Sequence, residues 1–117
     1  AQELGLPMNA DFNGPQQEGA GWYQVTVRNG VRCSAATAYL KPALRRPNLR
    51  LETDAQATRV LVEGGRAMGV EYRRGGETRT AHAREVVLAG GAINSPQLLM
   101  LSGIGPAAHL QDLGIPV

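Results

Sequence analysis

Residues 85–105, EVVLAGGAINSPQLLMLSGIG, decide the class of fold that this chain can adopt. Four apolar residues follow one another in Glu85–Ala89, and a run of this length is typical of a strand buried on both faces. Gly90–Gly91 ends the run. The pair Ser95–Pro96 predicts the N-terminus of a helix, and Gly103 is placed to end that helix in the left-handed conformation. A buried strand that leads through a glycine pair into a helix predicts an α/β fold.

The junction between this strand and this helix permits two interpretations. The N-terminus of a helix carries partial positive charge and unpaired N–H groups, both of which favour a phosphate. The missing Cβ atoms of Gly90 and Gly91 would also let a ligand approach the backbone. The alternative is that the two glycines only allow the strand and the helix to pack tightly.

Strand-like segments precede this stretch. Three of them, Thr58–Glu63, Ala67–Tyr72 and Thr78–Ala83, are separated by glycine pairs that suit hairpin turns. Sequential strands joined by short turns predict a three-stranded antiparallel β-meander. Leu49–Thr53 also alternates in the manner of a strand.

The first third of the chain is rich in turn formers. They gather in residues 9–21, which predicts an ordered loop. Trp22–Val27 then alternates as a strand does, and Asn29–Gly30 is a tight-turn pair.

Short helices are expected in two further places. Ser34 is the predicted cap of a helix over Ala35–Leu40, and Pro47 stops that helical stretch. A second short helix is expected from Pro106 to Leu113, where Gly114 closes it.

Composition excludes several classes of protein. The chain has 117 residues, of which 43% are hydrophobic and 19% charged, a balance typical of a folded domain with a modest core. No apolar run approaches the roughly 18 residues of a transmembrane helix, and no signal peptide is visible. A single cysteine, Cys33, excludes an internal disulfide, and with only two histidines it excludes a zinc-finger framework.

The net charge of +2 does not indicate a nucleic-acid partner. The arginines are spread from Arg28 to Arg84, with two short pairs at 45–46 and 73–74. A nucleic-acid interface needs basic residues clustered on one face, so we interpret these arginines as a solvated surface.

Two stretches resemble the glucose–methanol–choline (GMC) family of FAD-dependent oxidoreductases. Asn9–Gly21 looks like that family's loop entering the substrate domain, and Gly91–Gly105 matches its second signature almost position by position. The spacing of the segments between them is similar to that of choline dehydrogenase-like members. The chain is identified on these grounds as an internal fragment of such a protein.

The resemblance implies a fold, a reaction and a set of binding residues. Residues 34–117 would be part of a Rossmann-like FAD-binding domain with a three-stranded antiparallel β-meander and short helices. Residues 1–33 would be a loop and strand on the substrate-domain side. Family members pass hydride from a primary alcohol such as choline to FAD. The resemblance places FAD contacts at Ala57, where the backbone meets the adenine, and at Ala89, Gly90 and Gly91, beside the adenosine and pyrophosphate.

Several parts of the family's machinery are absent from the sequence. The G-x-G-x-x-G fingerprint is missing, and its relaxed match at residues 103–108 follows a helix rather than a strand, so it is rejected as a dinucleotide loop. Neither His82 nor His109 matches the family's catalytic position, and both are expected to have surface or packing roles. Cys33 is expected to be a packed or semi-exposed thiol. The chain therefore contains no predicted catalytic or metal-binding residue.

Two functions follow as hypotheses. In the first, the chain is a segment of an FAD-dependent alcohol dehydrogenase or oxidase and is inert and free of FAD when alone. In the second, it is a stand-alone, non-catalytic binding or interaction domain whose exposed strand edges pair into a homodimer. Neither includes a nucleic acid or a membrane span, and nothing in the sequence signals a compartment, so the cytoplasm is the default expectation.

Overall fold

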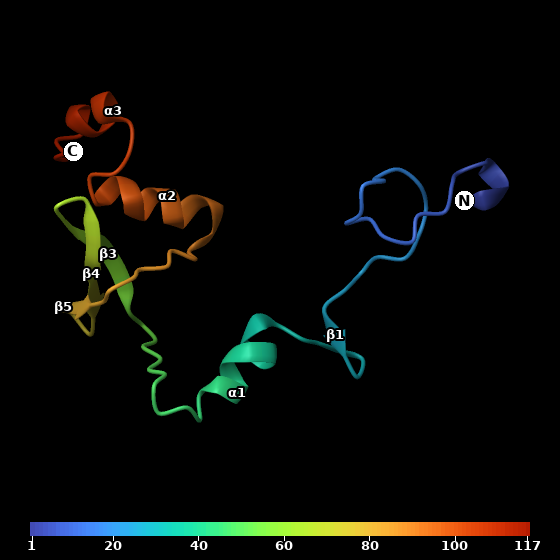
Figure 1. Ribbon diagram of the computed structural model, residues 1–117, viewed down its shortest axis with the longest axis horizontal. Helices are drawn as coiled ribbons and strands as arrows, with labels where there is room; N and C mark the ends of the chain where they lie inside the picture. Colours follow the sequence, from blue (N-terminus) through green and yellow to red (C-terminus); the bar gives the residue numbers. More distant parts are fainter. The chain divides into compact units, whose positions relative to one another are not determined.

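Three antiparallel strands form the largest sheet of the computed structural model, which describes residues 1–117 (Figure 1). They are β3 (Gln56–Glu63), β4 (Arg66–Arg74) and β5 (Glu77–His82), in the order β3-β4-β5. The glycine pairs at 64–65 and 75–76 all have positive φ, which is the conformation that these tight turns need. The predicted β-meander is confirmed.

A β-bulge decides which side chains of β3 share a face. The register passes from Ala57 opposite Tyr72 to Arg59 opposite Glu71, so Thr58 is the extra residue. Residues three apart in β3 can therefore point to the same side. Ala57 and Val60 do so, and Val60 is only 6% exposed.

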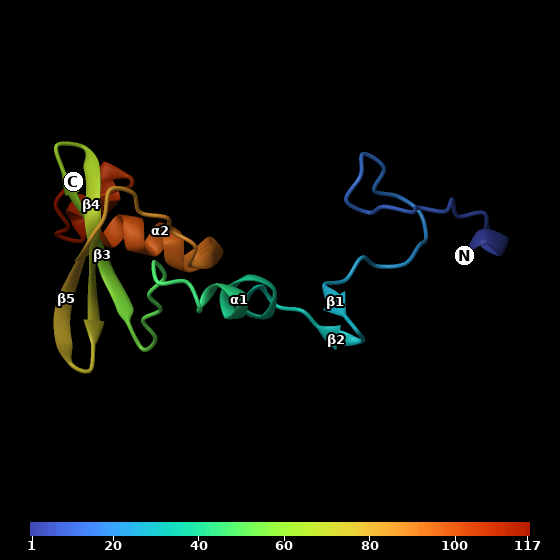
Figure 2. The ribbon, with the colours of Figure 1, turned by 60° about the horizontal axis from the view of Figure 1, so that its bottom comes forward.

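Helix α2 (Gly91–Leu101) packs against β3, as Figure 2 shows. The helix begins at Gly91, so the predicted start at Ser95 is wrong. Ser95 instead lies inside the helix, where its Oγ accepts a hydrogen bond from the N–H of Gly90 at 2.9 Å. Gly91 has a φ of +88°, and this sharp reversal lets the helix begin directly after the glycine pair.

Both C-terminal helices end as predicted. Gly103 follows α2 with a φ of +82°, and its N–H donates to the carbonyl of Met100 while that of Ile104 donates to Leu99. This is the Schellman arrangement, in which a left-handed glycine satisfies the last carbonyls of the helix. Helix α3 (Ala107–Asp112) ends in the same way at Gly114, and its Leu110 is fully buried.

The predicted strand Glu85–Ala89 is not a strand in this structure. The segment is extended but pairs with no other strand of the chain. Val86 and Leu88 are half-buried, whereas Val87 between them is 82% exposed. An apolar run folds as a buried strand only where neighbouring strands supply hydrogen bonds on its edges, and residues 1–117 supply none here.

The chain divides into two compact units, residues 1–51 and residues 52–117, and the elements above belong to the second. In the first unit, β1 (Val27–Arg28) and β2 (Val31–Arg32) form a hairpin. Its turn is the predicted Asn29–Gly30 pair, with φ of +51° and +75°. The predicted strand Trp22–Val27 is wrong up to its last residue, because no neighbouring strand pairs with it, and Trp22 is 92% exposed.

Helical structure after Ser34 is confirmed. A π-helix, η2 (Ala36–Leu40), continues into α1 (Lys41–Ala43), and Ser34 Oγ accepts a hydrogen bond from the Thr37 N–H at 3.3 Å. The predicted strand Leu49–Thr53 is wrong, since this segment has no strand partner. No helix of the chain combines the length and the apolar character that a membrane-spanning segment requires.

An ordered loop follows the short helix η1 (Gln2–Leu4), as predicted. The side chain of Asn9 holds this loop together. Asn9 is 6% exposed, and its Nδ2 donates to the carbonyls of Gln16 and Glu18 at 2.7 and 3.3 Å. Its Oδ1 accepts from the Asp11 N–H at 2.9 Å. One buried amide therefore satisfies three backbone groups that the irregular loop would otherwise leave unpaired.

Candidate functional site

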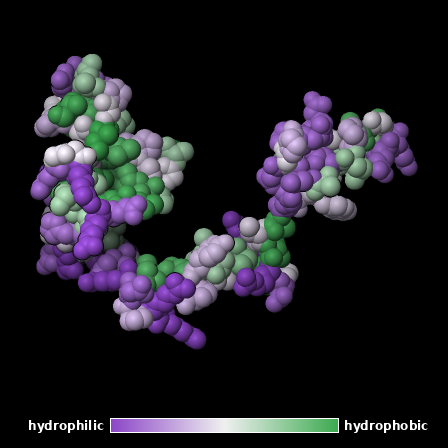
Figure 3. All heavy atoms as spheres, in the orientation of Figure 1, coloured by the Kyte–Doolittle hydropathy of each residue, from purple (hydrophilic) through white to green (hydrophobic).

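A cavity of about 640 Å³ lies within residues 52–117. It is lined by the start of β3, by residues 86–90 of the extended segment and by one face of α2. Figure 3 shows apolar atoms gathered where the helix meets the sheet. A volume of this size is in the range of small-molecule and cofactor pockets, about 300–1,000 Å³.

The structure brings three of the four predicted cofactor-binding residues together in this cavity. Ala57 lines it from β3, while Ala89 and Gly90 line it from the segment before α2. Ala57 is more than thirty residues from Ala89 and Gly90 in the sequence, and the packing of α2 on β3 makes them neighbours. Gly91 adjoins Gly90 at the first position of the helix but does not line the cavity.

Backbone geometry also favours glycine at both Gly90 and Gly91. A Cβ on Gly90 would lie 3.2 Å from the Cβ of Asn94 and 3.4 Å from the backbone N of Ser95, so its absence permits the tight turn onto the helix. A Cβ on Gly91 would meet nothing within 4 Å, but the φ of this residue favours glycine. The interpretation of close packing therefore accounts for Gly90, and ligand contact at either glycine stays a prediction.

The cavity carries no charged side chain. Its polar groups are the amides of Gln56, Asn94 and Gln97 and the hydroxyl of Ser95, set among small and aliphatic residues. Amides can donate and accept hydrogen bonds, which suits the edge of an uncharged heterocycle or a sugar hydroxyl. The lining thus fits the nucleoside half of a dinucleotide better than its phosphates, which favour cationic or backbone donors.

Sequence reasoning missed the contribution of the helix to this cavity. Asn94, Ser95, Gln97, Leu98 and Leu101 line it, and their spacing of three, four and seven residues is that of one helical face. The pattern was present in the sequence. A helix that begins at Ser95, as the sequence predicts, does not include Asn94. The sequence alone therefore does not place these five residues on one helical face.

None of the other residues singled out by sequence lines the cavity. His82 ends β5 and His109 lies on α3, and both are exposed. Cys33 is a half-exposed free thiol, as predicted. Ion pairs occupy three of the arginines, namely Arg59 with Glu71, Arg74 with Glu52 and Arg79 with Glu77.

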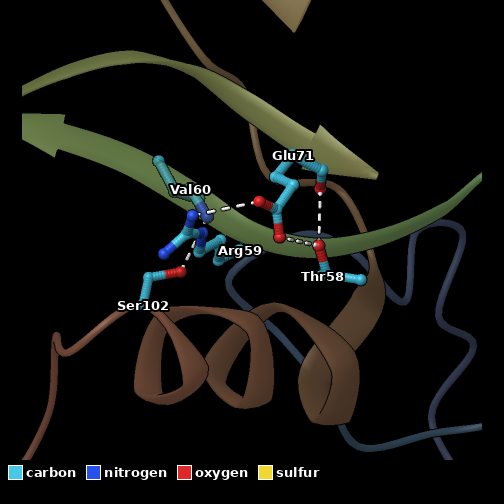
Figure 4. Close-up of polar contacts among 5 residues, drawn as sticks. All are labelled: Thr58, Arg59, Val60, Glu71 and Ser102. Atoms are coloured by element: carbon cyan, nitrogen blue, oxygen red, sulfur yellow. Dashed lines mark hydrogen bonds and ion pairs between the residues drawn. The ribbon is translucent and has the colours of Figure 1, made fainter. Parts of the chain in front are cut away.

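A polar network on β3 and β4 flanks the bulge next to the cavity (Figure 4). Thr58 Oγ1 donates to the carboxylate of Glu71 at 2.8 Å, and Arg59 donates to the same carboxylate at 3.0 Å. The hydrogen bond from Thr58, followed by the bond and the charge of Arg59, lowers the pKa of Glu71 below its ordinary 4.5. Beyond the network, the hydrogen bond and charge of Glu77 raise the pKa of Arg79.

The lowered pKa of Glu71 predicts a dependence of stability on pH. A carboxylate whose folded pKa is depressed stabilises the fold fully above its unfolded pKa, and this stabilisation is lost as pH falls through the folded value. We expect Glu71→Gln to reduce the melting temperature at neutral pH, and we expect this deficit to shrink only as the pH falls through the folded pKa of Glu71, which lies below 4.5. Glu63→Gln, at an exposed end of β3, is the control. A deficit for Glu71→Gln that is the same at every pH would contradict this account.

Comparison with known proteins gives a family match across the chain. The family model described as GMC oxidoreductase matches residues 1–116. The mitochondrial choline dehydrogenase of Homo sapiens is 58% identical over 117 residues, which are 99% of this chain and 20% of that protein. The oxygen-dependent choline dehydrogenase of Sinorhizobium fredii is 53% identical, over 99% of this chain and 21% of its own length.

Solved structures agree with the sequence comparisons. Pyridoxine 4-oxidase from Mesorbium loti aligns with a TM-score of 0.71 and 37% identity, covering 77% of this chain and 18% of the oxidase. An FAD-dependent oxidoreductase from Chaetomium thermophilum aligns with a TM-score of 0.70 and 36% identity, over 74% of this chain and 15% of its own. The chain thus spans about a fifth of the length of the curated relatives that it matches.

Proposed function

The chain belongs to the GMC oxidoreductase family, and from this premise we propose that residues 52–117 form the adenosine-side wall of an FAD site in a longer enzyme that oxidises an alcohol. The observation that carries the proposal is the convergence of Ala57, Ala89 and Gly90 on one cavity. The family resemblance of the sequence predicts each of these three residues as an FAD contact.

The cavity's lining supports a neutral part of the cofactor as the occupant. Ala57 and Ala89 have small side chains, which leave room for a planar ring at the start of β3 and at the end of the extended segment. The amides of Gln56 and Gln97 would orient that ring and its sugar by hydrogen bonds. Gly91, next to the cavity, would lie at the pyrophosphate side.

The proposed reaction follows from the relatives' names. Two of them are choline dehydrogenases, and choline is a primary alcohol. Bound FAD would supply the acceptor for the hydride that leaves the carbinol carbon of such a substrate. The residues of this chain hold and orient the cofactor. The general base and the substrate pocket belong to other parts of the longer enzyme, and residues 1–33 would lie on its substrate-domain side.

The extended segment supports the same proposal. Val87 is 82% exposed between two half-buried neighbours, and the backbone of residues 85–89 has no strand partner within the chain. An apolar segment of this kind is stable when strands on both sides pair with it. Strands of the longer enzyme would supply this pairing and complete the Rossmann-like sheet.

Enlarging Ala57 tests the proposal. In the longer enzyme, we expect Ala57→Leu to weaken FAD binding about 10- to 100-fold, because overfilling a packed site costs ~1–3 kcal/mol and each 1.4 kcal/mol is tenfold. Size exclusion with visible absorption detection measures flavin content and molecular mass together. Ala81→Leu, at an exposed position of β5 outside the cavity, is the matched control.

The same measurement, made on the isolated 117-residue chain, separates the two hypotheses about its function. A colourless monomer is expected, since one wall of a site rarely holds a cofactor whose other contacts are missing. A colourless dimer would favour the interaction role, with pairing through the free edge of β5, all six residues of which are exposed. In the longer enzyme, unchanged flavin content in Ala57→Leu would reject the proposed contact between Ala57 and FAD.

A further inference from the structure

The hydroxyl of Ser102 joins α2 to β3. Ser102 is the residue directly after α2, and its Oγ accepts a hydrogen bond from the backbone N–H of Val60 at 2.7 Å. The same hydroxyl donates to the carbonyl of Leu98 at 2.6 Å. Figure 4 shows the side chain rising from the end of the helix toward the strand. One side chain thus links a strand and a helix through two residues that are 42 positions apart.

The Val60 N–H depends on this hydroxyl. Strand β3 pairs with β4 along one edge only, and its other edge has no strand neighbour in the chain. Val60 is 6% exposed, so water reaches little of it. Without Ser102 Oγ, a buried backbone donor would lose its partner, which costs more than the hydrogen bond itself contributes.

This link adjoins residues that line the cavity. Leu98, whose carbonyl accepts from Ser102, lines the cavity, and so does Leu101, the residue before Ser102. On the strand side, Val60 shares a face with Ala57 because of the bulge at Thr58. The two walls of the cavity are therefore tied together through Ser102.

The rest of the contact between α2 and β3 is less specific. The side chains that α2 turns toward the cavity include two leucines, and apolar contacts between a helix and a sheet do not define one separation or register as a hydrogen bond does. The Ser102 bonds are short and directional, and the glycine after Ser102 turns the chain away at once. The helix can shift along the strand only if these bonds break.

We propose that Ser102 is a positioning residue for the nucleotide site, because its hydroxyl sets the distance between α2 and β3 and with it the width of the cavity. This inference rests on the proposed function, since it assigns the cavity to the adenosine half of FAD. Ser102 itself touches no cofactor in this proposal. It acts through the Val60 amide and the Leu98 carbonyl.

The test uses the longer, flavin-loaded enzyme. Flavin release on dilution is followed by fluorescence, and we expect Ser102→Ala to accelerate it about tenfold. Hydrogen exchange of the Val60 amide is measured in the same variant and is expected to become faster. Ser102→Thr keeps the hydroxyl and is expected to restore both values to within about threefold of the unmodified enzyme.

A matched control separates positioning from general destabilisation. Ser34 accepts the backbone N–H of Thr37 at 3.3 Å at the start of η2, in residues 1–51, so Ser34→Ala removes an exposed hydrogen bond between a serine hydroxyl and the backbone at a residue that does not line the cavity. It is expected to leave flavin release unchanged. If Ser102→Ala does not fold, Ser102→Cys, a weaker hydrogen-bonding group of similar size, is compared with Ser102→Thr, and equal release rates in these two would overturn the proposal.

The outcomes also distinguish this inference from the proposed function. Release from Ser102→Ala at the unmodified rate, together with flavin loss in Ala57→Leu, would overturn the positioning role and leave the FAD site in place. Unmodified flavin binding in both variants would reject the FAD site as well. Faster release that Ser102→Thr does not restore would assign the effect to the shape of the serine rather than to its hydroxyl, and would overturn the proposal.

Discussion

Gly69→Ala is expected to destabilise the meander by about 3 kcal/mol, at the upper end of what overpacking costs. Gly69 lies in the central strand β4, opposite Leu61 of β3 and His82 of β5, and it is buried. A Cβ at this position would lie 2.3 Å from the backbone oxygen of Ala81. Because the obstacle is the backbone of a paired strand, it cannot move aside without breaking the ladder between β4 and β5. Thermal unfolding of the protein, followed by circular dichroism, measures the loss.

Gly76→Ala is the control for Gly69→Ala. Gly76 has a φ of +85° in the turn between β4 and β5, and a Cβ there would meet nothing within 4 Å. Alanine at this position bears only the cost of the left-handed conformation, ~1–2 kcal/mol. Equal losses in the two variants would show that close approach of β5 is not the reason for the glycine in β4.

Gly103→Ala is expected to cost about 3 kcal/mol by a combination of two effects. The residue has a φ of +82°, which costs alanine ~1–2 kcal/mol. In addition, its Cβ would lie 2.4 Å from the backbone oxygen of Pro116, so the C-terminal residues that fold back past the end of α2 must be displaced. The melting temperature measures the sum. A rise in hydrogen exchange at Ile104, whose N–H donates to Leu99, would locate the damage.

Gly114→Ala is the control that separates the two effects. Gly114 ends α3 by the same pair of hydrogen bonds as Gly103 ends α2, and its φ is +71°. A Cβ there would meet nothing within 4 Å. The difference between the two variants therefore reports the contact with Pro116 alone. If Gly114→Ala is as damaging as Gly103→Ala, that contact contributes nothing.

Local chemistry explains the parts of the fold that were predicted correctly. The turns at 64–65 and 75–76 and the ends of α2 and α3 each need a left-handed residue, and glycine meets this need through its own backbone. The meander is also local, because each strand pairs with the next one along the chain. Such features can be predicted from a few neighbouring residues.

The wrong predictions share one physical cause. Glu85–Ala89, Leu49–Thr53 and the first part of Trp22–Val27 have strand-like patterns, yet none has a strand partner in residues 1–117. Alternation of apolar and polar residues, or a continuous apolar run, indicates which faces of a segment favour burial. These patterns do not report whether a second strand is present to satisfy the backbone.

The sequence by itself determined the family, the order of the turns and strands within the meander, and the four residues proposed for FAD. Their assignment came from family resemblance, and the comparisons confirm the family. Tertiary structure alone decided that Ala57, Ala89 and Gly90 line the same cavity and that Ser102 joins its two walls. It did so through the β-bulge at Thr58 and through the docking of α2 on β3, which joins Val60 to Ser102 across 42 positions of the sequence and which no local pattern encodes.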